Sequence, residues 1–177
     1  MSRTNPYKKK RRRASRTLLV FGEGFGEEMF LKHLKSIYLC RDSGISIKIC
    51  KGRGGTPHDI IIDAYRTPGA FDRKIVILDN DRTKTEITKA RQEARRRNIE
   101  LIENIPCLEF LLVSILDEKP SEKSSGWCKG EFESKYLNKK KRGEPNEYKK
   151  LFPKELLDAK RSKITELNNM ILIWTVE

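Results

Sequence analysis

The stretch that most constrains this chain is residues 73–81, Arg-Lys-Ile-Val-Ile-Leu-Asp-Asn-Asp. Residues 75–78 form a continuous apolar run rich in β-branched side chains, which is typical of a strand buried on both faces. The run ends in Asp79 and Asp81, and residues two apart in an extended chain point to the same side. In open parallel sheets, sites form beyond the carboxyl ends of the strands, where two carboxylates suit a hard cation such as magnesium. The alternative is a polar turn in which Asp79 caps the next helix.

Strands and helices are expected to alternate four times across residues 17–116, on the pattern of apolar runs, turn residues and helix caps. This rhythm predicts an α/β fold with a mostly parallel central sheet and right-handed crossovers. The expected strands are 17–21, 46–50, the run ending at Asp79, and 99–102; the expected helices are 27–39, 57–65, 84–97 and 107–116.

The chain is expected to divide into four parts. Residues 1–15 form a basic disordered arm, and residues 16–116 form the α/β core. Residues 117–146 lose the apolar pattern and are expected to be a long, charged, exposed excursion. Residues 147–177 form a small helical extension that packs on the core, with helices near 147–151 and 153–169 and a final strand at 171–176.

The net charge of +13 is concentrated at one end of the chain. Residues 1–16 hold eight Lys and Arg residues and no acid, so the remaining residues carry only +5. Such an arm neutralises phosphates and releases counterions, which indicates nucleic-acid binding; binding to acidic lipid and a role in solubility are the alternatives. The basic residues expected to contact nucleic acid there are Lys8, Lys9, Lys10, Arg11, Arg12 and Arg13.

The remaining composition indicates a cytoplasmic protein without a membrane span. The four cysteines are scattered and form no Cys-x-x-Cys pair, which argues against a zinc site or a disulfide framework. No apolar run approaches the roughly 18 residues of a membrane span, and the basic N-terminal residues lack the apolar stretch of a signal peptide.

Carboxylates follow three of the expected strands. Glu23 ends the first strand, Asp79 and Asp81 end the third, and Glu109 lies just beyond the fourth. If these strands are neighbours, the acids converge on one edge, where they repel one another unless a metal neutralises them. Glu23 is then the candidate for proton transfer. Glu109 is either a member of this site or a surface acid on its helix.

Two motifs in this order resemble those of Toprim domains, which pair a Glu-Gly turn after the first strand with an Asp-x-Asp after a later one. Here they are Glu23-Gly24 and Asp79-Asn80-Asp81. The chain is more closely similar to the RloB-like branch, which is related to the overcoming-lysogenisation-defect (OLD) nucleases. The segments that carry this likeness are 23–28 (Glu-Gly-Phe-Gly-Glu-Glu), 54–57 (Gly-Gly-Thr-Pro) and 104–109 (Asn-Ile-Pro-Cys-Leu-Glu).

The resemblance implies a Toprim-like, Rossmannoid three-layer fold and Mg²⁺-dependent chemistry on a phosphodiester, with Mn²⁺ as an alternative. It implies that Glu23 is a general acid or base and that Asp79 and Asp81 are metal ligands. It also makes Glu27 a further ligand; the alternative is that an acid there complements the helix dipole. Gly26 replaces the usual Thr of the first motif. The implied metal set is Glu23, Glu27, Asp79, Asp81 and Glu109.

The first expectation for function is therefore a metal-dependent nuclease, which family analogy places in bacterial defence against phage, with an ATPase partner chain. Lys51 and Arg53 in the glycine loop, together with Arg82, are the expected contacts to DNA or RNA outside the arm. The alternative is a catalytically idle Toprim-fold subunit that binds nucleic acid or a partner. A nucleotide-transferring, primase-like enzyme is a third option, disfavoured by the size of the chain.

Overall fold

The computed structural model describes residues 14–40, 42–116 and 124–175. Its strands are β1 (Arg16–Gly22), β2 (Ile45–Lys51), β3 (Arg73–Asp79) and β4 (Glu100–Asn104). The helices that alternate with them are α1 (Phe25–Tyr38), α2 (Pro57–Arg66), α3 (Lys84–Arg96) and α4 (Leu108–Leu116). The later part contains α5 (Ser125–Glu131), the π-helical turn η1 (Phe132–Tyr136), the 3₁₀ turn η2 (Lys139–Lys141), α6 (Pro145–Leu151), α7 (Lys154–Arg161) and α8 (Thr165–Leu172).

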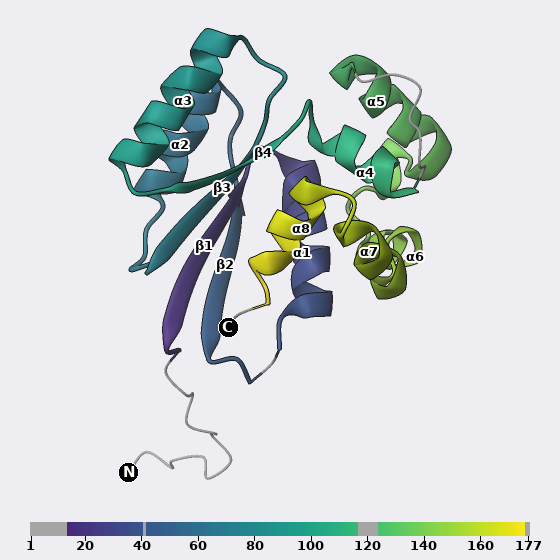
Figure 1. Cartoon of the computed structure of the whole chain (residues 1–177), viewed down its shortest axis with the longest axis horizontal. Helices are drawn as coiled ribbons and strands as arrows, with labels where there is room; N and C mark the ends of the chain where they lie inside the picture. Colours follow the sequence, from purple (N-terminus) through teal and green to yellow (C-terminus); the bar gives the residue numbers. More distant parts are fainter. Residues whose placement is uncertain (1–13, 41, 117–123, 176–177) are drawn as a thin grey trace, which may run out of the picture.

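The four strands form one parallel sheet in the order β2-β1-β3-β4. β1 and β3 are the central strands, and their registers place Gly22 beside Ile77 and Asp79 beside Asn104. The carboxyl ends of all four strands therefore meet at one edge of the sheet. The prediction of an α/β fold with a parallel sheet in three layers is confirmed (Figure 1).

Helices cover both faces of this sheet (Figure 1). Side chains of the central strands alternate between the two faces, so Leu19 and Val76 face α2 and α3 while Val20 and Ile77 face α1. The C-terminal helices extend the layer that contains α1, and α8 contacts both β4 and α1. The central strands are buried on both faces, which explains why the apolar runs identified them in the sequence.

The α2 and α3 helices begin where their sequences predict. Thr56 and Thr83 are the N-cap residues, and each accepts a hydrogen bond from the backbone N–H three residues on, at Asp59 and Glu86. The acid side chain at that position bonds back to the cap residue, which completes a capping box.

The segment 124–146 differs from the exposed excursion that we expected. Its described residues are largely helical; Cys128 is buried, and Phe132 and Leu137 are buried in the core on the α1 side of the sheet. Three apolar residues spaced by four and five positions among many charged ones were too sparse to reveal this helix from the sequence. Residues 1–13, which make up most of the basic arm expected over residues 1–15, and residues 117–123 lie outside the described residues.

The final strand expected at 171–176 is wrong for its described part, because Ile171 lies in α8 and the chain continues in turns. Leu167, Met170, Ile171 and Trp174 are buried and recur at helical spacing. The β-branched composition at the end of the chain concealed this helical period. The single helix expected over 153–169 is also divided, into α7 and α8.

Candidate active site

The turn after β1 brings an acidic helix end close to the sheet edge. A Cβ atom on Gly22 would lie 2.5 Å from the Cβ of Glu27, so only glycine allows α1 to approach β1 this closely. Glu27 is 6% exposed, and its Oε2 accepts a hydrogen bond from Gly24 N at 2.9 Å. Glu27 therefore satisfies the N-terminus of α1, in line with the helix-dipole alternative, and does so at the edge of the sheet where the strands end. Glu28 instead faces Lys32 on the surface.

Asp79 is anchored between β3 and α4. Its Oδ1 accepts hydrogen bonds from Leu108 N at 2.9 Å and from Asn104 Nδ2 at 3.2 Å. The alternative in which Asp79 caps the next helix is wrong, since Thr83 caps α3 and Asp79 bonds to the start of α4. As the strand geometry predicts, Asn80 points elsewhere, donating to Glu103 Oε2 at 2.7 Å.

Glu23 reaches the end of the neighbouring strand. Its Oε2 accepts a hydrogen bond from Asp79 N at 3.1 Å. Burial raises the pKa of Glu23; this hydrogen bond lowers it, and repulsion from Asp81 raises it further. The structure thus brings Glu23 together with both aspartates, as the order of the motifs predicted.

Two further carboxyls have strongly raised pKa values. Burial raises the pKa of Asp79 to about 8, with added repulsion from Glu27, Glu23 and Glu109. Burial also raises the pKa of Glu27 to about 7, again with repulsion from Glu109 and Glu23. Near neutral pH, these groups hold protons that free carboxyls would have lost.

Glu109 faces the same cluster from the first turn of α4. Its Oε2 atom is buried and has no hydrogen-bond partner among the described residues. A buried oxygen without a donor is unfavourable, since it loses its hydration without compensation. We expected Glu109 to be either a member of the site or a surface acid on its helix. Its repulsion of Glu27 and Asp79 supports a position in the site.

Lys129 on α5 is the residue of this cluster that the sequence analysis missed. Its Nζ lies 3.8 Å from Asp81 Oδ2, and the Asp81 side chain also approaches Arg82 Nε at 3.9 Å. Burial lowers the pKa of Lys129, but attraction to Glu109, Asp79 and Asp81 outweighs it, so that the net pKa is raised. Lys129 lies in the segment that we expected to be an exposed excursion, and no motif marked it.

Carboxylate oxygens are the ligands that a hard divalent cation prefers. Among the described residues, Glu109 Oε2 has no hydrogen-bond partner and could accept such a cation. In the three ranges that the structure describes, however, no three carboxylate, His or Cys side chains are arranged to hold a metal ion. Glu23, Glu27 and Asp79 bond instead to backbone N–H groups. Each of these hydrogen bonds engages one oxygen of its carboxylate, so the other oxygen is the one that a cation could take.

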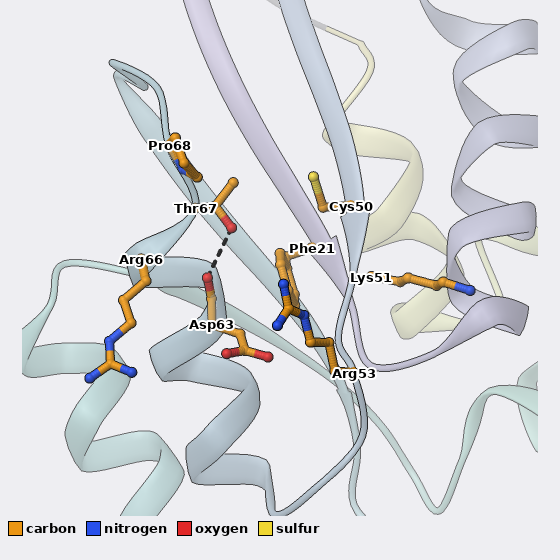
Figure 2. A pocket seen from close by; sticks show the side chains of 8 residues that line it. All are labelled: Phe21, Cys50, Lys51, Arg53, Asp63, Arg66, Thr67 and Pro68. Atoms are coloured by element: carbon orange, nitrogen blue, oxygen red, sulfur yellow. Dashed lines mark hydrogen bonds between the residues drawn. The ribbon is translucent and has the colours of Figure 1, made fainter.

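The basic residues expected to contact nucleic acid do not form one group. Lys51 Nζ lies 4.0 Å from Glu28 Oε2 and 4.9 Å from the centre of the Phe25 ring, on the α1 side. Figure 2 shows Arg53 on the other side, near Phe21 and Asp63. Arg82 accompanies Asp81. Lys8, Lys9, Lys10, Arg11, Arg12 and Arg13 lie outside the described residues.

Comparisons of the chain with protein-family models, with curated proteins and with solved structures gave no match. Within the described ranges, no helix is long and apolar enough to cross a membrane. The function is therefore inferred from the acidic edge, which consists of Glu23, Glu27, Asp79, Asp81 and Glu109 at the carboxyl ends of the strands.

Proposed function

We propose that this protein is a metal-dependent nuclease that hydrolyses phosphodiester bonds of DNA or RNA at the carboxyl edge of its sheet. The observation that carries the proposal is the mutual repulsion of Glu23, Glu27, Asp79 and Glu109, which end or follow three different strands. Buried acids that repel one another cost stability, so their presence together favours a functional role over a structural one.

Each residue would have a separate task in this chemistry. Asp79, Asp81 and Glu109 would supply the anionic oxygens for Mg²⁺ or Mn²⁺, with Glu27 as a further ligand. When bound there, the cation would supply neutralisation of charge on the attacked phosphoryl group and on the leaving oxygen. Glu23 has a raised pKa, which suits a group that must both accept and give a proton near neutral pH.

The likeness of the Glu23-Gly24 and Asp79-Asn80-Asp81 motifs to those of Toprim domains supports the same reaction class, and both motifs lie at strand ends. By analogy with RloB-like and OLD-family proteins, we propose that the nuclease acts in defence against phage together with an ATPase chain. Fold analogy alone carries this biological role and this partner.

One observation favours the alternative of a catalytically idle subunit that binds nucleic acid or a partner. Three of the acids already bond to backbone N–H groups, and Lys129 supplies a positive charge beside Asp81. A permanently bound internal cation of this kind would remove the need for a metal. The same experiment distinguishes the two functions.

The experiment is cleavage of end-labelled duplex DNA, tRNA and single-stranded RNA by the purified chain with Mg²⁺, with Mn²⁺ or with EDTA. We expect metal-dependent products that are absent with Asp79→Asn and Asp81→Asn, because a neutral amide is a weaker ligand than a carboxylate. Asp42→Asn is the matched control, since Asp42 is exposed in the α1–β2 connection. Products that persist with Asp79→Asn would place the reaction elsewhere. Binding of a substrate without cleavage under any metal condition would favour the idle subunit.

A further inference from the structure

A second feature of the sheet is a cavity beside its edge strand β2. Along β2, Ser46, Lys48 and Cys50 point away from the α1 side; Ser46 and Lys48 are exposed, and Cys50 packs against the cluster beneath α2. α2 lies farther in, over the central strands. The space between β2 and α2 is a cavity of about 380 Å³, which falls within the roughly 300–1,000 Å³ of small-molecule sites. Its wall includes Phe21, Cys50, Arg53, Asp63, Arg66 and Pro68.

The cavity has guanidinium groups without acidic partners. In the part of the chain that the structure describes, neither Arg53 nor Arg66 forms an ion pair, whereas Arg73 and Arg91 are each bound to a glutamate by two hydrogen bonds. Figure 2 shows the Arg53 side chain directed between Phe21 and Asp63, with Arg66 at the opposite rim. A planar guanidinium with free N–H groups is the protein group best matched to a phosphate.

Lys48 adds a third positive charge beside this cavity. Its Nζ donates a hydrogen bond to the carbonyl oxygen of Pro68 at 3.4 Å, at the wall of the cavity. Asp63 is the one acid of the cavity wall, so the net charge of the group stays positive. Such a surface attracts an anion and disfavours a cationic or purely apolar ligand.

The cavity adjoins the acidic edge through the backbone of Gly52. Gly52 joins the Arg53 loop to the sheet: its N–H donates to Gly22 O at 2.9 Å, and a Cβ on it would lie 2.8 Å from Glu23 O. The backbone that positions Glu23 therefore contacts the backbone that presents Arg53. We infer that the cavity between β2 and α2 binds a backbone phosphate of the nucleic-acid strand, on the side of Glu23 opposite to Asp79. This inference rests on the proposed function for its choice of ligand.

Cys50 makes the inference directly measurable. It is half-buried at the cavity wall, while Cys40 is exposed outside it and Cys107 and Cys128 are buried in the core. The rate of alkylation by iodoacetamide at Cys50 and Cys40, read by peptide mass spectrometry, reports occupancy of the cavity with an internal reference. The measurement is made in EDTA, with inorganic phosphate, with AMP or with a single-stranded oligonucleotide as the probe.

We expect the oligonucleotide to slow alkylation of Cys50 several-fold and to leave Cys40 unchanged. Phosphate and AMP should protect only at far higher concentration, since a polymer is also held at its other phosphates. Equal protection by phosphate and by the oligonucleotide would identify a small-anion site and overturn the assignment to a nucleic-acid strand. Absence of protection by all three probes would overturn the inference outright.

Charge variants give a second test that does not depend on the reactivity of Cys50. Arg53→Glu should weaken oligonucleotide binding roughly tenfold, the value of one charge-assisted hydrogen bond, and Arg66→Glu should weaken it less. Asp63→Asn should tighten binding, because it removes the acid from the cavity. Lys163→Glu makes the same change of charge at an exposed turn between α7 and α8, on the other face of the sheet, and serves as the control. Equal effects of Arg53→Glu and Lys163→Glu would contradict the inference.

The two proposals fail in different ways. One possible result is that Arg53→Glu cleaves as well as the wild type and that no probe protects Cys50. This result would contradict the phosphate site and would leave the proposed nuclease activity standing. If the oligonucleotide protects Cys50 but no metal condition gives cleavage, the phosphate site is supported and the nuclease activity is contradicted. Thermal melting of each variant excludes unfolding as the cause; Arg53→Gln replaces Arg53→Glu if the charge reversal lowers the melting temperature.

Discussion

Glu23 accepts a hydrogen bond from the backbone N–H of Asp79, so the acid that ends β1 is held by the first residue of the acidic pair that ends β3. This contact fixes Glu23 across the gap between two neighbouring strands. It uses only one carboxylate oxygen, and an amide oxygen could accept the same hydrogen bond. Replacement by Gln therefore tests the charge and the proton of Glu23 while its position is kept.

We expect Glu23→Gln to fold like the wild type and to lose cleavage by a factor on the order of 10² to 10⁴, the usual contribution of general acid–base catalysis. Cation binding, measured by calorimetry, should be retained in large part, because Asp79 and Asp81 remain. Glu23→Ala should lose cleavage and also lower the melting temperature, since Asp79 N is left without an acceptor. Full cleavage by Glu23→Gln would exclude Glu23 from proton transfer.

The raised pKa values of Asp79 and Glu27 predict how stability changes with pH in the absence of a divalent cation. Between the unfolded pKa, near 4, and the folded values of about 7 and 8, the folded protein holds protons that the unfolded chain has lost. Unfolding then releases protons, so the free energy of unfolding falls as pH rises, by at most about 1.4 kcal/mol per pH unit for each group.

Asp79→Asn should flatten this dependence because it removes the group with the larger shift. Urea unfolding in EDTA at about pH 5, 6, 7 and 8 measures the slope for the variant and the wild type. Asp42→Asn should keep the slope of the wild type. A wild-type protein that becomes more stable from about pH 5 to 8 would show that these carboxyls are not held in their neutral form.

Gly52→Ala should damage both the sheet edge and the proposed chemistry. Its Cβ would lie 2.5 Å from Ile60 Cδ1 and 2.8 Å from Glu23 O, and the second neighbour is backbone that cannot rotate away. We expect a loss of about 1–3 kcal/mol in the free energy of unfolding, together with reduced cleavage. Gly126→Ala in α5 meets no atom within 4 Å and should be neutral or stabilising. Equal stability of the two variants would contradict this account.

The sequence predicted which acids lie at the strand ends, but it did not predict that Lys129 of α5 joins them. Asp79 and Glu23 follow apolar runs buried on both faces, and such runs identify central strands and the edge at which they end. Lys129 lies in a short helix with few apolar residues. Packing between distant parts of the chain brings it beside Asp81, and no local pattern predicts this contact. Lys51 and Arg53 share a loop in the sequence, yet the turn at Gly52 directs them to opposite faces of the sheet, which no local pattern reveals.

The basic arm predicts a stronger salt effect than the folded part alone would produce. Residues 1–13 contain seven Lys and Arg residues and no acid. Deletion of residues 1–13 keeps the contacts of Ser15 with Gly44 and should leave the melting temperature unchanged. Affinity for an oligonucleotide should fall, and its dependence on salt should flatten by about 0.7 in log–log slope for each lost phosphate contact on a single strand. An unchanged slope would show that the arm does not contact the nucleic acid.

Lys129 gives the prediction that distinguishes an internal cation, which would replace a metal ion, from a side chain that only competes with one. Its Nζ lies 3.8 Å from Asp81 Oδ2, and the Lys129 side chain is 47% exposed, so this ion pair contributes less than about 1 kcal/mol. Lys129→Met removes the charge and keeps much of the apolar stem. Since Asp79 and Glu27 ionise as pH rises, the variant should lose more stability at pH 8 than at pH 5 in EDTA. Lys163→Met is the control and should show no such difference.

The same variant should bind Mn²⁺ more tightly than the wild type, because the ammonium group of Lys129 and a divalent cation are attracted by the same carboxylates. Calorimetric titration of Lys129→Met, the wild type and Asp79→Asn with Mn²⁺ measures this order of affinity, with Asp79→Asn expected to be the weakest. If Lys129 is also needed to hold the substrate, cleavage will fall although the metal binds better. Weaker Mn²⁺ binding by Lys129→Met would show that Lys129 organises the acids for the metal and does not compete with it.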